Sequence, residues 1–184
     1  MNRLMNHLMI LWTTLRRVRY SVKSGRLCTG RSMRVAILAI GRARDDPAKR
    51  IYDEYMGRLP WPHELKELQE NKPLPEAKRK AREADLLLHA VPDGATIIAL
   101  DGGGRMLSSE DFARRIGSWR DDGAPALAFL LGGAHGHGDS VLKRANLTLS
   151  FGPMVWPHLL ARAMLAEQLW RAASILSGHP YHRA

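Results

Sequence analysis

The sequence predicts an α/β fold in which a mostly parallel sheet carries helices on both faces. Short, uniformly apolar runs recur along the chain from residue 33 onward, and each ends in glycine or another turn signal. Charged or amphipathic segments of helical length separate these runs. Strands that are apolar on both sides belong to sheets covered on both faces, which is the arrangement of parallel sheets.

The first half of this pattern begins at Met33–Gly41, a buried-strand run ended by glycine. A helix is expected from Asp45-Asp46-Pro47, because acids suit the positive end of a helix and proline suits its first turn. It runs to Gly57. A short strand is expected near Leu65–Leu68, and a strongly charged helix from Pro75-Glu76.

The next strand is predicted at Ala95–Asp101, and the glycines at 102–104 are expected to form the loop after it. Ser108 with Asp111 three residues later predicts a capped helix start. A further strand follows at Leu127–Leu131.

The last quarter of the chain predicts a short helix over Asp139–Ala145 and a strand over Leu147–Ser150. A long helix then runs from Pro157 to Ser177, and Gly178 is placed as its C-terminal cap.

The charge is unevenly distributed. The chain of 184 residues has a formal net charge of +10. Residues 1–32 hold seven of the 28 basic residues and no acid, so residues 33–184 hold 21 basic and 18 acidic residues, a net charge of +3. This mildly basic body is compatible with a phosphate-containing partner without establishing one.

Residues 1–32 are interpreted as an extension and residues 33–184 as one domain. Three interpretations of the extension stay open: an upstream start with Met33 as the physiological first residue, an Arg-rich transit peptide, or a basic arm that touches RNA. The single cysteine, Cys28, excludes an internal disulfide framework and a multi-cysteine zinc site. No apolar run reaches the ~18 residues of a membrane span, so a soluble, cytoplasmic protein is expected.

Candidate binding residues follow three predicted strands, at the ends where parallel sheets bind ligands. The segments are 101–104, 132–138 and 151–158. The spacing Gly132-Gly133-x-x-Gly136-x-Gly138 matches neither a phosphate loop nor a dinucleotide fingerprint, which favours a nucleoside without pyrophosphate. An ordinary glycine-rich turn is the alternative. His135 and His137 are interpreted as solvated or RNA-facing, with no metal expected, because further ligands at metal spacing are missing.

The C-terminus combines Tyr181, His182 and Arg183 around a proline. Such groups stack on bases and bind phosphate, although a solvated tail is the alternative. Covalent catalysis is disfavoured, because no G-x-S-x-G motif occurs and Cys28 lies in the extension.

Several ordered segments of residues 33–184 resemble the ribosomal large-subunit pseudouridine methyltransferase H family, in the SPOUT class of knotted methyltransferases. The segments are Met33–Gly41, Ile98-Ala99-Leu100-Asp101, Ser108-Ser109-Glu110-Asp111-Phe112-Ala113, Leu131-Gly132-Gly133-Ala134-His135-Gly136, Leu149-Ser150-Phe151, Trp156-Pro157-His158, Arg162, Glu167-Gln168-Leu169-Trp170-Arg171-Ala172 and His179-Pro180-Tyr181-His182-Arg183. The one small departure is Trp170, where tyrosine is common.

The resemblance implies a homodimer with a deep C-terminal trefoil knot, acting with S-adenosylmethionine on N3 of a pseudouridine in 23S RNA of the assembled ribosome. The implied cofactor-binding residues are Leu100, Gly132, Phe151, Gly152, Pro153, Met154, Val155 and Trp156. His182 is the candidate proton acceptor or relay, since histidine accepts protons near neutral pH. Arg183 would stabilise charge or hold phosphate, and Tyr181 would position the base. Arg162 would serve the RNA or the dimer interface.

Two alternatives to this function stay open. One is a noncatalytic ribosome-binding protein with the same fold. The other is a SPOUT methyltransferase that acts on tRNA.

Overall fold

The computed structural model describes residues 33–182. The expectations for residues 1–32, for Arg183 and for the side chain of His182 lie outside the described part. The elements, in chain order, are β1 (Arg34–Ile40), α1 (Pro47–Arg58), β2 (His63–Leu68), α2 (Glu76–Ala90), β3 (Thr96–Met106), α3 (Ser109–Asp121), β4 (Ala126–Leu131), α4 (Asp139–Arg144), β5 (Leu147–Ser150), α5 (His158–Ser177) and a 3-10 turn at Pro180–His182.

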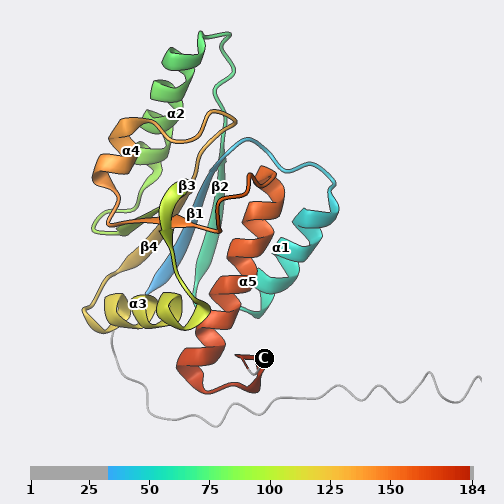
Figure 1. The fold of residues 1–184 in the computed structure, drawn as a ribbon, viewed down its shortest axis with the longest axis vertical. Helices are drawn as coiled ribbons and strands as arrows, with labels where there is room; N and C mark the ends of the chain where they lie inside the picture. Colours follow the sequence, from blue (N-terminus) through green and yellow to red (C-terminus); the bar gives the residue numbers. More distant parts are fainter. Residues whose placement is uncertain (1–32, 183–184) are drawn as a thin grey trace, which may run out of the picture. The chain divides into compact units, whose positions relative to one another are not determined.

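The five strands form one sheet in the order β2-β1-β4-β3-β5, and all four strand pairs are parallel. Helices cover both of its faces (Figure 1). The α/β fold class predicted from the sequence is therefore confirmed, including the parallel sheet between two helical layers.

The core is divided between the two faces of the sheet. Odd-numbered residues of β1, such as Ile37, pack with α1, α3 and α5, whereas even-numbered ones, such as Leu38, pack with α2 and α4. Both residues are fully buried. This two-sided burial explains why the strand is apolar throughout rather than alternating.

Local signals set most of the helix ends as predicted. Asp46 caps α1 by accepting a hydrogen bond from the Ala48 amide at 2.7 Å. Ser108 caps α3 by accepting one from the Asp111 amide at 3.1 Å. Gly178 ends α5 in the left-handed conformation, with φ of 69°. Within residues 33–182, no helix combines the length and the apolar composition that crossing a membrane requires.

The segment at 102–104 differs from the predicted loop. It lies within the bounds of β3, which returns to pair with β5 after a break in register between Leu100 and Arg105. A Cβ on Gly104 would lie 2.7 Å from the carbonyl carbon of Thr148, so only glycine permits this contact between the two backbones. The tight approach depends on pairing with a strand more than 40 residues later, which local sequence does not reveal.

Candidate active site

A cavity of about 360 Å³ lies where three loops leave the neighbouring strands β3, β4 and β5. Because the strands are parallel, their carboxyl ends meet at one edge of the sheet. All eight residues that the resemblance implied for the cofactor line this cavity: Leu100, Gly132, Phe151, Gly152, Pro153, Met154, Val155 and Trp156. The structure thus brings together segments that are up to 56 residues apart in the chain.

The lining of the cavity is mainly apolar, and none of the described residues in it is a lysine or an arginine. The ionisable residues among them are Asp101 and His158. At the rim, Met154 and Val155 are 68% and 97% exposed, so apolar side chains stand open to a ligand. Such a site suits a compact ligand with an apolar or aromatic part and disfavours a polyphosphate, whose charge would go unmatched.

The glycine loop after β4 forms one wall of the cavity, and its glycines are needed for packing within the protein. A Cβ on Gly132 would lie 2.9 Å from the carbonyl carbon of Gly136, and one on Gly133 would lie 2.5 Å from a carboxylate oxygen of Glu83. Gly136 itself has a φ of 72°, which favours glycine. The spacing therefore reflects a loop folded tightly on itself and against α2.

His137 holds this loop to the end of β3. Its Nε2 donates a hydrogen bond to the Leu100 carbonyl at 3.0 Å, and the residue is only 3% exposed. The sequence-based interpretation of His137 as solvated or RNA-facing is therefore wrong. His135 does lie at the surface, with Nδ1 3.1 Å from the Glu76 carboxylate.

Ser150 holds the third loop in place. Its hydroxyl oxygen lies 3.2 Å from the Gly102 carbonyl and 3.1 Å from the Gly152 carbonyl, the two acceptors within reach of its single proton, and it accepts a hydrogen bond from the Gly152 amide at 3.1 Å. The glycine at 152 has a φ of 112°. The roles of Ser150 and His137 in shaping the cavity could not be predicted from local sequence, because each residue contacts a carbonyl at least 37 residues away.

Stability is expected to fall on acidification because His137 is buried. Burial lowers the pKa of His137 below its ordinary value of 6.5, against the opposing effect of the Asp101 charge. Below pH 6.5 the unfolded chain takes up this proton more readily than the folded one, so the free energy of unfolding decreases. Melting temperatures between about pH 8 and pH 5 should show this loss.

The control for this effect is His137→Gln, which keeps a donor for the Leu100 carbonyl but has no group that titrates in this range. Its melting temperature should depend less on pH than that of the wild type. Equal pH dependence in the two proteins would contradict the assignment.

The C-terminal tail is held on its own chain by Tyr181. The Tyr181 hydroxyl lies 3.2 Å from both the Tyr55 hydroxyl and the Glu167 carboxylate. Its ring contacts Trp170 at a centroid distance of 5.8 Å, and the Arg171 guanidinium lies 5.1 Å from the ring centroid. Burial and these hydrogen bonds raise the pKa of Tyr181, so the hydroxyl stays protonated near neutral pH. This arrangement anchors the tail and leaves Tyr181 less free to position a base than expected.

Arg162 lies in the interior, where it is 3% exposed. Its Nη1 donates to the Glu67 carboxylate at 2.6 Å, and its Nη2 donates to the carbonyls of Ile40 at 3.1 Å and Gly41 at 2.8 Å. The expected contact with RNA or a second subunit does not fit this position, because the guanidinium is enclosed by its own chain. Instead, Arg162 joins α5 to the ends of β1 and β2.

Among residues 33–182, no group of three or more histidine, cysteine, aspartate and glutamate side chains could hold a metal ion.

Comparison with known proteins decides the family. Residues 33–182 match a family model described as "Predicted SPOUT methyltransferase". The chain belongs to the SPOUT methyltransferase family. A relative from Rhodospirillum centenum, named "Ribosomal RNA large subunit methyltransferase H", is 55% identical over 152 residues, which cover 83% of this chain and 100% of the relative. One of the same name from Paramagnetospirillum magneticum is 56% identical over 151 residues, covering 82% and 99%.

A solved structure has a similar fold. A probable methylase family protein from Haemophilus influenzae matches with a TM-score of 0.50, over 80% of this chain and 67% of the other, at 12% identity. At that identity the match concerns the fold alone.

Proposed function

We propose that this protein transfers the methyl group of S-adenosylmethionine to N3 of a pseudouridine in the large-subunit (23S) ribosomal RNA. One observation carries the proposal: the eight residues implied for the cofactor line a single cavity at the carboxyl edge of the sheet. Family membership and relatives named for large-subunit RNA methylation support the same reaction.

The cavity fits S-adenosylmethionine in size and in charge. Its volume of about 360 Å³ falls in the range of small-molecule sites. Apolar walls suit the adenine and the methionine chain, and the carboxylate of Asp101 suits a cationic ligand that carries no phosphate. Among the described side chains, the indole Nε1 of Trp156 is buried without a hydrogen-bond partner. Leu100, Gly132 and residues 151–156 would hold the cofactor, which supplies an electrophilic methyl group.

The protein itself must orient the base and allow a proton to leave it. N3 must be held in line with the transferred methyl group, which is catalysis by positioning. N3 must also lose its proton, and His182 is the proposed acceptor or relay. Arg183 would stabilise the negative charge that develops on the base. We assign Tyr181 to anchoring these two residues, because its hydroxyl and ring are already engaged by α1 and α5.

A homodimer is part of the proposal, and the position of the tail supports it. His158, at the start of α5, lines the cavity, whereas Tyr181 is tied to Glu167 nine residues further along the helix. Nine residues of helix span about 14 Å. A second copy of the chain could bring its tail to this cavity.

The trefoil knot of the family is also proposed here.

The proposed partner is the large-subunit RNA in the assembled ribosome, in the cytoplasm. The described chain forms one domain without a separate RNA-binding module, so a large preformed target is favoured over free tRNA. The alternatives are a tRNA substrate and a noncatalytic protein that keeps the fold.

Methyl transfer from labelled S-adenosylmethionine separates these functions. The full chain would be incubated with 70S ribosomes, isolated subunits and bulk tRNA, all from a strain that lacks the enzyme. We expect label in a large-subunit pseudouridine that depends on assembled ribosomes. Label in tRNA would mean that the substrate is tRNA rather than ribosomal RNA. Cofactor binding without label in any RNA would support the noncatalytic alternative.

A further inference from the structure

Residues 70–82, which lead into α2 and form its first half, concentrate the positive charge of the described domain. The basic residues of this region, here called the basic end of α2, are Lys72, Lys78, Arg79, Lys80 and Arg82. Residues 70–82 hold these five and two acids, a net charge of +3. This equals the net charge of residues 33–184, so the rest of that segment has 16 basic and 16 acidic residues.

The exposed cations of α1 and most of those of α3 are paired with nearby acids, unlike most of those on the basic end of α2. The pairs on α1 and α3 include Lys49 with Asp53, Arg58 with Glu54, Arg114 with Asp111 and Arg120 with Asp121. On the basic end of α2, the one ion pair among the described side chains joins Arg82 to Glu70 at 3.3 Å. Lys143 and Arg144 of α4 also lack an ion pair among the described side chains, so it is the clustering of five cations within residues 70–82 that distinguishes the basic end of α2.

The position of these cations is unfavourable for the helix itself. Helix α2 begins at Glu76, so Lys78, Arg79 and Lys80 lie in its first two turns. That end of a helix carries partial positive charge and favours acids over bases. The charges therefore lower helix stability, and a negatively charged partner would offset this cost.

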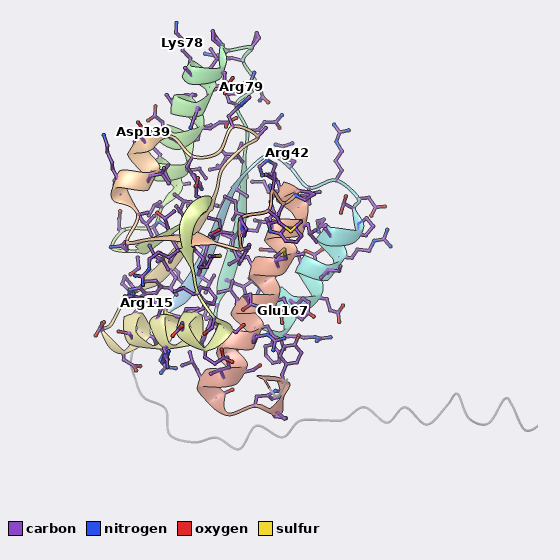
Figure 2. The ribbon with its side chains drawn as sticks, in the orientation of Figure 1. Arg42, Lys78, Arg79, Arg115, Asp139 and Glu167 are labelled. Carbon is purple, nitrogen blue, oxygen red and sulfur yellow. The ribbon has the colours of Figure 1, made fainter. Side chains whose placement is uncertain are left out.

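The basic end of α2 lies beside the cavity. The Glu76 carboxylate meets His135 at 3.1 Å, and a Cβ on Gly138 would lie 2.9 Å from that of Ala84. Both contacts are made by the glycine loop, whose residues 132–134 and 136 line the cavity. Figure 2 shows Lys78 and Arg79 at the end of α2 that extends beyond the sheet, with Arg115 of α3 far from them.

We propose that the basic end of α2 is a docking surface for the phosphate backbone of folded RNA, which it holds next to the cavity. The inference rests on the proposed function and names the part of the protein that receives its substrate. Flexible lysine and arginine side chains neutralise closely spaced phosphates without reading bases, which positions a structured RNA.

The test compares two triple variants of the full chain that remove equal charge. Lys78→Gln/Arg79→Gln/Lys80→Gln changes the proposed surface, and Arg114→Gln/Arg115→Gln/Arg120→Gln changes α3. Glutamine has a helix propensity close to those of lysine and arginine, so both should fold. The α2 variant should melt at or above the wild-type temperature, because cations leave the positive end of the helix.

The α2 variant should raise KM for ribosomes by about tenfold or more, with kcat changed less than about twofold. For protein-free large-subunit RNA, the slope of log affinity against log salt concentration should become less negative by about three, which is one for each cation removed. Affinity for S-adenosylmethionine should not change. The α3 variant should behave like the wild type in all of these assays.

Unchanged RNA affinity and salt dependence in the α2 variant, or equal losses in both variants, would overturn the proposal. A loss with ribosomes but not with protein-free RNA would also overturn it, because the partner would then be an acidic ribosomal protein. RNA affinity is measured without catalysis, so a wild-type protein that binds RNA but transfers no methyl group contradicts the proposed function alone.

Discussion

Removal of residues 182–184 is expected to lower methyl transfer to ribosomes by at least about a hundredfold, which is the rate enhancement that a positioned proton acceptor commonly provides. The deletion takes away His182, the proposed acceptor, and Arg183, the proposed stabiliser of charge on the base. The described residues that line the cofactor cavity all lie between 100 and 161, before the deleted segment. Affinity for S-adenosylmethionine should therefore stay unchanged in a calorimetric titration.

The same deletion should leave the fold intact, because the anchor of the tail lies before it. Tyr181 keeps its contacts with Tyr55 and Glu167, and Gly178 still ends α5. Deletion of Ala184 alone is the matched control and should retain full activity. Wild-type turnover in the three-residue deletion would remove His182 and Arg183 from the mechanism.

A mixture of two inactive variants tests whether a second copy of the chain completes the site. One variant lacks residues 182–184. The other is Ala161→Trp, whose larger side chain fills the cavity from α5. Mixed dimers carry one intact cavity and one intact tail, so activity should return if the tail serves the cavity of the other subunit.

Substitution of Arg162 by leucine is expected to lower the free energy of unfolding by about 3–5 kcal/mol, the usual cost of removing one partner from a buried ion pair. The variant leaves the Glu67 carboxylate without its cation and the carbonyls of Ile40 and Gly41 without their donor. Glu67 would retain the Ala43 amide, at 2.6 Å, as its donor. Urea unfolding followed by circular dichroism measures the loss.

The double variant Arg162→Leu/Glu67→Leu separates the ion pair from general packing. Once the carboxylate is also removed, no uncompensated charge remains, so the double variant should be more stable than Arg162→Leu alone. Arg162→Lys should remain destabilised, because one ammonium cannot reproduce the planar fork that reaches three acceptors. A loss below about 1 kcal/mol in Arg162→Leu would show that the pair contributes little.

Most of the fold could be predicted from local sequence. The capping residues Ser108 and Gly178 each act within a few positions of the helix end that they define, and the apolar run of β1 shows burial on both faces. The passage of Gly104 against the β5 backbone could not be predicted, because it depends on a register set between distant segments.

In the candidate site, too, some features could be predicted from the sequence, and those that depend on distant contacts could not. The three loops could be assigned to one edge because parallel strands end together, and the resemblance supplied the residues within them. The burial of His137 was missed, since its partner, the Leu100 carbonyl, is a backbone group with no sequence signal. Arg162 was misplaced for a similar reason: its partner Glu67 lies 95 residues earlier, on a half-exposed edge strand.

Calorimetric titration of S-adenosylmethionine into the full chain tests most directly whether the cavity at the ends of β3, β4 and β5 holds the methyl donor. We predict saturable binding that Ala161→Trp abolishes and that Ala81→Trp, the same change at an exposed position that does not line the cavity, leaves intact. Equal melting temperatures would confirm that both variants fold. No binding by the wild type, or equal binding by all three proteins, would contradict the account.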